Sequence, residues 1–242
     1  MRLPTIHGLI DRRLLINFRV DPQFVTPWLP VGISPQLVQG HAIVGICLIR
    51  LKQIRPVGLP RWLGIGSENM AHRVAIESPP GSTSPYSVYI ARRDTNSRLN
   101  ALVGGRLFPG EHHHSTFTVH ESGDQIAIHV LSHDQKMEVR VSGTVGRDLR
   151  AGSVFASMDE ISEFHRNASC GYSPTSGSER LDSLEMNCQG WHCEPFDVAH
   201  FSSTFYDDAQ QFPLGSIVLD SALCMHQIEH KWLGRPDYWP QK

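Results

Sequence analysis

The chain has 242 residues, 40% of them hydrophobic and 19% charged, with a formal net charge of -2. This composition supplies enough apolar side chains for a sizeable core and argues against intrinsic disorder. Acids and bases are nearly balanced, which excludes the strongly basic surface that nucleic-acid binding requires, and one domain over residues 1–242 is the simplest prediction.

In the first half of the chain, runs rich in Ile, Val and aromatic residues predict β-strands. These strands are expected at Leu14–Val20, Gly40–Leu51, His72–Glu77 and Ser87–Arg92. Asp21 followed by proline is typical of a helix N-terminus and predicts a short helix over Pro22–Leu29. The Gly- and Pro-rich segment RPVGLPRWLGIG predicts a loop after the second strand.

The second half of the chain is also predicted to be mostly strand. His114–His120 and Gln125–Leu131 are expected to form a hairpin, and Lys136–Val145 its neighbour. A short helix is predicted at Asp159–Arg166, capped by Ser157 or Asp159, with a Ser/Gly/Pro-rich loop over Asn167–Glu179. Two further strands are expected at Leu184–Trp191 and Val218–His226. Alternation of strands with helices is too weak for a parallel α/β sheet, so an antiparallel barrel or sandwich is predicted.

Cellular location is also predictable from composition. No run approaches the ~18 apolar residues that span a bilayer, and Asp11, Arg12 and Arg13 interrupt the apolar opening of the chain. The five cysteines are odd in number and never form CxxC, which is typical of unpaired thiols in a reducing compartment. We therefore expect a soluble, cytoplasmic protein with no membrane partner.

The segment from Glu68 to His114 carries the most specific pattern. SENMAHRVAIE precedes YIARRDTNSRLNALVGGRLFPGEHHH, and this order of parts resembles acetoacetate decarboxylase, with Glu68, Arg106 and Phe108–Pro109 at matching positions. The flanking stretches NFRVDP, GICLIRLKQIRPVGLP and CEPFD resemble more closely the family DUF2071, which is grouped with it, and that likeness spans nearly the whole chain. The resemblance implies a mainly β fold: an antiparallel, cone-like β-barrel with a few peripheral short helices.

One departure from the decarboxylase pattern changes the expected chemistry. In the decarboxylase, a lysine pair follows the aromatic-Pro pair, and its first lysine forms a Schiff base; here those positions hold Gly110 and Glu111. Only four of the 22 basic residues are lysine, and none has a sequence context that suits it as a substitute. Imine-forming decarboxylation is therefore not predicted.

The densest cluster of titratable residues is the run from Glu111 to His114. Because strand side chains alternate between faces, His112 and His114 should share one face, and His113 should be the buried histidine beside Phe117. His113 could act as a general base with Glu111 or Glu68 setting its protonation state, or the run could be polar residues where the strand begins.

Two patterns in the sequence resemble metal-binding motifs. His112 and His114 could supply two imidazole ligands, but no third ligand is identifiable. HQIEH at 226–230 matches the inverted zinc-protease pattern, yet only twelve residues follow it, so chance or a surface-facing terminal turn is preferred. The sequence therefore predicts no metal and no cofactor. Arg92, Arg93 and Arg98 surround Asp94, and this pattern favours a solvated ion-pair loop over a substrate clamp.

Two functions remain open on these observations. The first is acid–base chemistry on a keto acid or related carboxylate, as in a lyase, hydratase or isomerase, with Glu68, Glu111 and His113 as catalytic groups. On this first hypothesis, the residues that bind an anionic ligand are Arg19, Arg106, His112 and His114. The second is a ligand-binding protein of the same fold without catalysis. A homo-oligomer is compatible with either.

Overall fold

The computed structural model describes residues 4–82, 84–104, 110–175 and 178–240. Twelve strands carry most of the chain: β1 (Ile6–Val20), β2 (Leu37–Val38), β3 (His41–Pro56), β4 (Ile65–Glu77), β5 (Tyr86–Thr95), β6 (His112–Ser122), β7 (Gln125–Ser132), β8 (Glu138–Val145), β9 (Cys170–Thr175), β10 (Ser178–Gln189), β11 (Glu194–Ser203) and β12 (Ile217–Gly234). The helical segments are short: η1 (Pro22–Phe24), η2 (Thr26–Trp28), η3 (Arg61–Leu63), α1 (Arg98–Val103) and α2 (Met158–Asn167).

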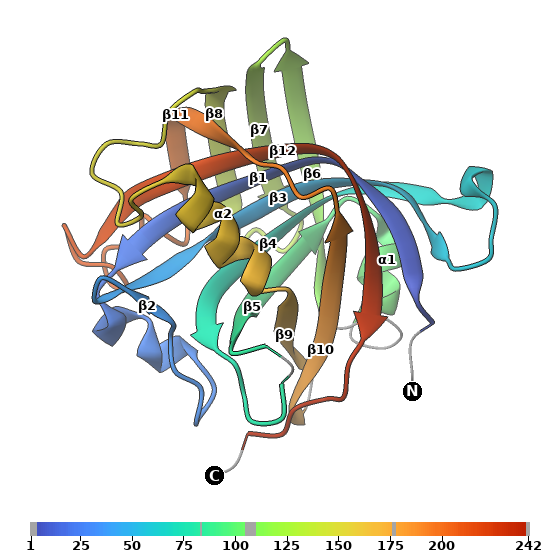
Figure 1. Cartoon of the computed structure of the whole chain (residues 1–242), viewed down its shortest axis with the longest axis horizontal. Coiled ribbons are helices and arrows are strands. Elements are labelled where there is room, and N and C mark those ends of the chain that lie inside the picture. The colour runs from blue at the N-terminus through green and yellow to red at the C-terminus, as the bar shows by residue number, and fades with distance from the viewer. Residues whose placement is uncertain (1–3, 83, 105–109, 176–177, 241–242) are drawn as a thin grey trace.

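The strands close into a barrel. Neighbouring strands run β1-β3-β4-β5-β6-β7-β8-β11-β12, and pairing of β12 with β1 completes a nine-stranded ring (Figure 1). A second circuit branches from it, because β9 and β10 bridge β5 to β12. We call this smaller circuit, β1-β3-β4-β5-β9-β10-β12, the β9–β10 ring. Pairing is antiparallel except that β5 is parallel to β6 and to β9.

Two apolar cores explain the uninterrupted hydrophobic run of β3. Val44, Ile46 and Leu48 pack in the core of the nine-stranded ring, while Ile43 and Cys47 pack on the opposite face. The second face is covered by α2, whose Ile161 is fully buried and which lies across the sheet in Figure 1. A strand buried on both faces needs apolar residues at successive positions rather than in alternation. The mainly β architecture predicted from sequence, a barrel with a few peripheral short helices, is confirmed.

Several local predictions need correction. Pro22–Leu29 forms two 3₁₀ turns rather than one helix, although Asp21 does cap the first by accepting a hydrogen bond from the Gln23 amide. The predicted loop Asn167–Glu179 contains β9 and the start of β10, and β11 was not predicted at all. The HQIEH segment lies inside β12 and is not a terminal turn. The hairpin of β6 with β7 and the Ser157 cap of α2 are confirmed.

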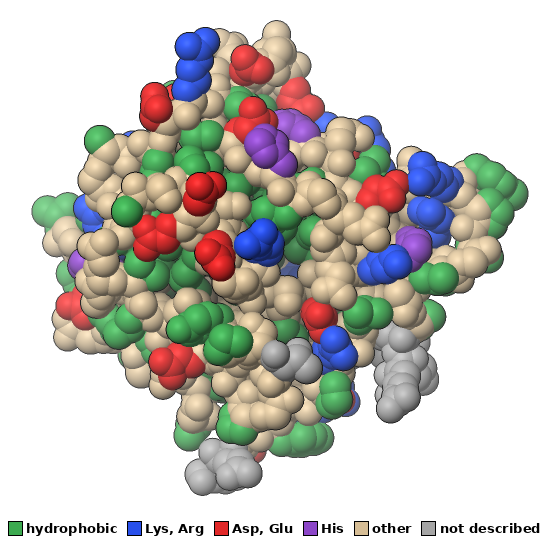
Figure 2. All heavy atoms as spheres, viewed as in Figure 1, with side chains coloured by type: hydrophobic (Ala, Val, Ile, Leu, Met, Phe, Trp, Pro, Cys, Tyr) green, Lys and Arg blue, Asp and Glu red, His purple; other side chains and the backbone are tan. Residues whose placement is uncertain are grey.

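Residues 57–64, between β3 and β4, project from the barrel, and we call them the arm. The indole of Trp62 at its tip is 79% exposed, and Val57 and Leu63 are exposed as well. Figure 2 shows the apolar tip of the arm on the right of the molecule, with Lys, Arg and His side chains gathered at its base. Within the described chain, no helix combines the length and hydrophobicity needed to cross a bilayer.

Candidate functional site

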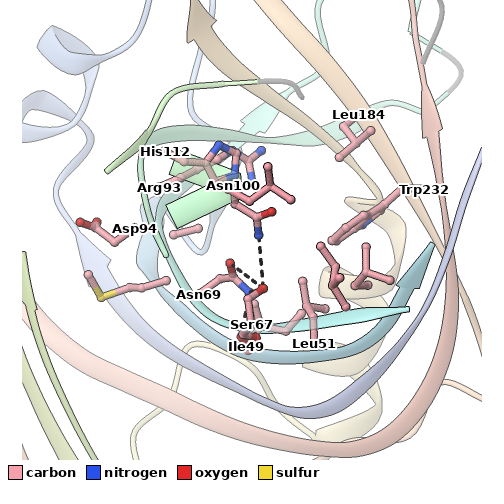
Figure 3. Close-up of a pocket in the computed structure, with 15 residues that line it drawn as sticks. Ile49, Leu51, Ser67, Asn69, Arg93, Asp94, Asn100, His112, Leu184 and Trp232 are labelled. Atoms are coloured by element: carbon pink, nitrogen blue, oxygen red, sulfur yellow. Dashed lines mark hydrogen bonds between the residues drawn. The ribbon is translucent and has the colours of Figure 1, made fainter. Parts of the chain in front are cut away.

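A cavity of about 260 Å³ lies on the α2 side of the sheet, at the end of the β9–β10 ring near α1 (Figure 3). Its walls come from β3, β4, β5, β6, β10, β12 and α1, so closure of the ring is what encloses it. The lining residues are Ile49, Leu51, Ile54, Ile65, Ser67, Asn69, Met70, Ala71, Arg93, Asp94, Leu99, Asn100, His112, Leu184 and Trp232. Aliphatic and aromatic side chains dominate this set, and the polar groups are few, as in most small-molecule sites.

Arg93 is the cation of the cavity. Its Nε and Nη2 donate hydrogen bonds to Ser173 Oγ at 3.2 and 3.0 Å, and it forms no ion pair with any described residue. Burial lowers the pKa of Arg93 to about 10, because removal from water disfavours the charged form. The guanidinium still carries its charge at neutral pH. The cavity therefore contains a positive charge that forms no ion pair with a described residue, although the charge of Asp182 acts on it from beyond ion-pair distance and raises its pKa.

His112 stands beside this cation. Its Nδ1 donates to the carbonyl oxygen of Gly110 at 3.0 Å, which leaves Nε2 as the unprotonated nitrogen of the neutral ring. Burial, and secondarily the charge of Arg93, lower the pKa of His112 to about 4. The imidazole is therefore neutral at pH 7 and offers an acceptor or a weak base.

Three polar side chains line the wall contributed by β4 and α1. Asn69 Nδ2 donates to Ser67 Oγ at 2.9 Å, and Asn100 Nδ2 approaches the same oxygen at 3.4 Å (Figure 3). Ser97 positions Asn100 by accepting a hydrogen bond from its backbone amide at the start of α1. These uncharged groups can orient a ligand by hydrogen bonding without competing with Arg93 for an anion.

Two further arginines project from the same face of the sheet. Arg13 Nε donates to Cys47 Sγ at 3.3 Å, and its guanidinium lies 5.8 Å from the centre of the Trp191 ring. Arg73 is buried and contacts only neutral groups, Asn17 Oδ1 and His165 Nδ1, and burial lowers its pKa to about 10. Neither forms an ion pair among the described residues. Arg13, Arg73 and Arg93 therefore add three positive charges on this face of the sheet that form no ion pair among the described residues.

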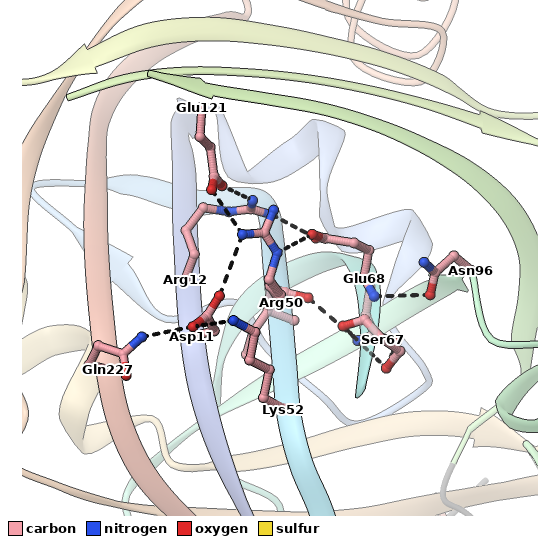
Figure 4. Close-up of polar contacts among 11 residues, drawn as sticks. Asp11, Arg12, Arg50, Lys52, Ser67, Glu68, Asn96, Glu121 and Gln227 are labelled. Atoms are coloured by element: carbon pink, nitrogen blue, oxygen red, sulfur yellow. Dashed lines mark hydrogen bonds and ion pairs between the residues drawn. The ribbon is translucent and has the colours of Figure 1, made fainter. Parts of the chain in front are cut away.

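Glu68 belongs to a different set of contacts, an ion-pair network across β1, β3, β4 and β6 (Figure 4). Its carboxylate accepts from Arg12 Nη2 at 2.7 Å and from Arg50 Nε at 2.5 Å, and Glu121 binds the same two arginines. Asp11 also belongs to the network, because it forms ion pairs with Arg50 and Lys52. Arg12 is 1% exposed, so the network satisfies a buried cation that ties the β6–β7 hairpin to the sheet.

The other predicted site residues are dispersed. Among the described members of the predicted set, only His112 lines the cavity; Glu68 lies on the opposite face of β4 from Ser67 and Asn69. Glu111 is exposed, and Arg19 pairs with Asp220 at 3.2 Å and donates to the Gly152 carbonyl. Arg106, with Phe108–Pro109, lies outside the described residues.

The prediction that His113 is the buried histidine is wrong. Its side chain is 37% exposed and lies 3.5 Å from Asp134, whereas His112 is half-buried and lines the cavity. His114 contacts His133, Nδ1 to Nδ1, at 2.9 Å. Alternation does hold from Ser115 onward, but the first residues of β6 also pair in parallel with β5, which brings His112 beside Arg93.

Gly110 shows why no side chain stands where the resemblance would put the Schiff-base lysine. Its φ of 76° lies in the left-handed region, which glycine adopts without strain. A Cβ at this position would lie 2.8 Å from Ser173 Cβ and 3.0 Å from Arg93 Nε. Among the described residues, no lysine lines the cavity.

The sequence did not identify Arg93 as a cavity residue. The arginine cluster around Asp94 was interpreted as a solvated loop, yet Asp94 is fully buried, where it pairs with Arg92 at 2.9 Å and accepts from Ser115. Because residues alternate along β5, burying Asp94 on one face directs Arg93 to the other. In the described residues, no group of three or more His, Cys, Asp or Glu side chains could hold a metal.

Comparisons with known proteins agree with this architecture. The family DUF2071, described as an uncharacterized conserved protein, matches residues 10–222. No curated protein matches the chain. Among solved structures, acetoacetate decarboxylase from Legionella pneumophila subsp. pneumophila str. Philadelphia 1 has a TM-score of 0.63 at 10% identity, covering 98% of this chain and 89% of that one.

Two other solved structures are similar in fold. An acetoacetate decarboxylase-like enzyme from Sphingomonas wittichii RW1 has a TM-score of 0.61 at 12% identity, covering 97% of this chain and 92% of that one. The enduracididine biosynthesis enzyme MppR, complexed with pyruvate, has a TM-score of 0.59 at 12% identity, covering 100% and 92%. At these identities the likeness concerns the fold.

Proposed function

The chain belongs to the DUF2071 family of uncharacterized conserved proteins, and we propose that it binds a small organic carboxylate of the keto-acid class in the cavity beside Arg93. The observation that carries the proposal is the guanidinium of Arg93, which lies in a mostly apolar cavity and forms hydrogen bonds to Ser173 but no ion pair with a described residue. Uncompensated charges are costly to bury, and a bound anion would offset that cost. A carboxylate also matches the planar fork of an arginine.

Two further observations support a keto acid with an apolar tail. MppR, which shares the fold, has been solved with pyruvate bound. In this chain, Leu51, Leu184 and Trp232 provide an apolar wall for an aliphatic tail. Each buried methylene should contribute about 0.8 kcal/mol, or about fourfold in affinity.

If the chain is an enzyme, we infer proton transfer next to a carbonyl, as in a lyase, hydratase or isomerase, with His112 as the acid–base group. A bound anion would offset the charge of Arg93 and so raise the pKa of His112 toward the range in which a base is effective. The roles predicted for Glu68, Glu111 and His113 stay predictions. No imine step is proposed, since no lysine among the described residues lines the cavity. The alternative is ligand binding without catalysis.

The test is calorimetric titration with pyruvate, 2-oxobutyrate and 2-oxovalerate. We expect affinity to rise along this series and to fall at least tenfold in Arg93→Met, because a charge-assisted hydrogen bond is lost. Arg140→Met, which removes an exposed guanidinium on β8, is the matched control and should bind like the wild type. Equal binding of a neutral alcohol of the same length would overturn the anion role of Arg93.

A second measurement separates the enzyme from the binding protein. Exchange of the protons α to the ligand carbonyl is followed by NMR in D₂O. Exchange in the wild type that is lost in His112→Phe, with binding retained, supports acid–base catalysis. Binding without exchange in the wild type favours the alternative.

A further inference from the structure

A second hollow, of about 270 Å³, lies where the arm leaves the barrel, and it shares no lining residue with the cavity. We call it the outer hollow. Trp232 lines the cavity, so its neighbour in β12, Lys231, points to the opposite face of the sheet. The outer hollow is therefore open to ligands that never enter the β9–β10 ring.

Three basic side chains form a row across this hollow. His7 of β1 pairs with Lys231 of β12 on one side and with Arg55 of β3 on the other, and cross-strand partners point to the same face. Lys231 and Arg55 therefore flank His7 on one face of the sheet, and their positive charges repel each other across β1. Among the described residues, neither Lys231 nor Arg55 forms an ion pair. A ligand that supplies negative charge would relieve this repulsion.

The one acidic residue that lines the described part of the hollow already forms an ion pair. Glu229 pairs with Arg61 of the arm at 2.8 Å. Counting Arg55, Arg61 and Lys231 as positive, Glu229 as negative and the two histidines, His7 and His230, as formally neutral leaves a formal charge of +2. A single carboxylate would neutralise only half of it.

The backbone holds Arg55 in place before any ligand arrives. A bulge shifts the register so that His7 pairs with Arg55 but Leu9 pairs with Lys52, and it sets Gln53 at a φ of 56°. Arg55 Nη1 donates to the Gln53 carbonyl at 2.7 Å and Nε to the Leu59 carbonyl at 3.1 Å. Nη2 has no partner among the described residues. Bulges commonly redirect side chains in this way, and a pre-organised guanidinium loses little entropy on binding.

We propose that the outer hollow is a binding site for a phosphate group, free or carried by an organic molecule. A phosphate carries about -1.5 to -2 charges at pH 7, which matches the charge of the site. Its oxygens can accept from Arg55 Nη2, the Lys231 ammonium and Arg61, which approach from three different elements. The site does not depend on the function proposed for the cavity.

The test is calorimetric titration with inorganic phosphate and with glycerol 3-phosphate at constant ionic strength. We expect saturable binding with one site, weakened about tenfold in Lys231→Met and in Arg55→Met. Lys136→Met, on an exposed turn, and Arg93→Met, in the cavity, should leave phosphate binding unchanged. Tighter binding of either probe identifies whether the free ion or the esterified group is preferred.

Two results would overturn the proposal. One is the absence of saturable binding of both probes. The other is binding that survives Lys231→Met and Arg55→Met but is lost in Arg93→Met, which would place the phosphate in the cavity. Because Arg55 also holds the arm, Lys231→Met is the decisive variant: its side chain is exposed and has no partner among the described residues, so it should fold like the wild type.

Discussion

Replacing Arg93 with methionine should stabilise the empty protein while it weakens ligand binding at least tenfold. Burial lowers the pKa of this guanidinium from 12.5 to about 10, and Arg93 is charged in both folded and unfolded chains at pH 7. At neutral pH the full pKa difference therefore destabilises the folded state, by about 1.4 kcal/mol per pKa unit, or about 3 kcal/mol in all. The hydrogen bonds to Ser173 that are lost offset about 1 kcal/mol of this.

The expected net gain is about 2 kcal/mol, which corresponds to a Tm increase of about 6 °C for a chain of this length. Urea denaturation and thermal melts without ligand measure it, and Arg140→Met should change stability by less than about 1 kcal/mol. Stabilising mutations at functional sites commonly cost activity. A Tm that falls by several degrees in Arg93→Met would refute the reasoning, because it would mean that the folded protein already compensates this charge.

Three further predictions follow from other buried groups. Burial lowers the pKa of His72, His112 and His230 to about 4, against about 6.5 in the unfolded chain. The stability that these neutral histidines allow above pH 6.5 should therefore be lost as the pH falls toward 4. The free energy of unfolding should fall by up to about 1.4 kcal/mol per pH unit for each histidine. His72 packs between Phe205 and Tyr206, and neither of its imidazole nitrogens has a described partner. His72→Phe should therefore reduce the dependence of unfolding free energy on pH, measured by urea titrations at pH 4.5 to 7.5. An unchanged pH dependence contradicts this prediction. Glu68→Gln should lower the free energy of unfolding by about 2–3 kcal/mol, because the buried charge of Arg12 loses an ion-pair partner. Most of this stability should be recovered in the double variant Glu68→Gln/Arg12→Met. An unchanged Tm with lost turnover would instead make Glu68 catalytic. Gly110→Ala should cost more stability than Gly32→Ala, since both have positive φ but only Gly110 has neighbours where the Cβ would go; equal losses would show that Ser173 and Arg93 move freely.

The sequence was a good guide wherever local pattern decides the structure. The runs that became β3, β7 and β8 are rich in β-branched residues, and the structure has strands there. It failed for Cys170–Thr175, whose Gly, Ser, Pro and Thr content is typical of a loop. That segment is a strand because β5 and β10 pair with it on either side, and such tertiary pairing overrides local propensity.

The candidate site was harder to predict for the same reason. His112 was identified as a ligand contact, but its burial depends on parallel pairing of Arg93 with His112, which joins segments separated by α1. Arg93 itself looks like one of several arginines in a charged stretch. The face of β5 that Arg93 occupies follows from the burial of Asp94 on the other face. No periodicity within the segment predicts that burial.

Gly110 and Arg93 together indicate how one fold can exchange one chemistry for another. The volume that a side chain at position 110 would need is filled by Ser173 and by the guanidinium of Arg93. An amine projecting from this position and a guanidinium held by Ser173 therefore compete for the same space. With glycine at position 110 the guanidinium of Arg93 keeps this space, and under the proposed function it binds the anion, whereas no amine stands at this position to form an imine. On this reasoning, Gly110→Lys would displace Arg93 and weaken carboxylate binding rather than create a decarboxylase.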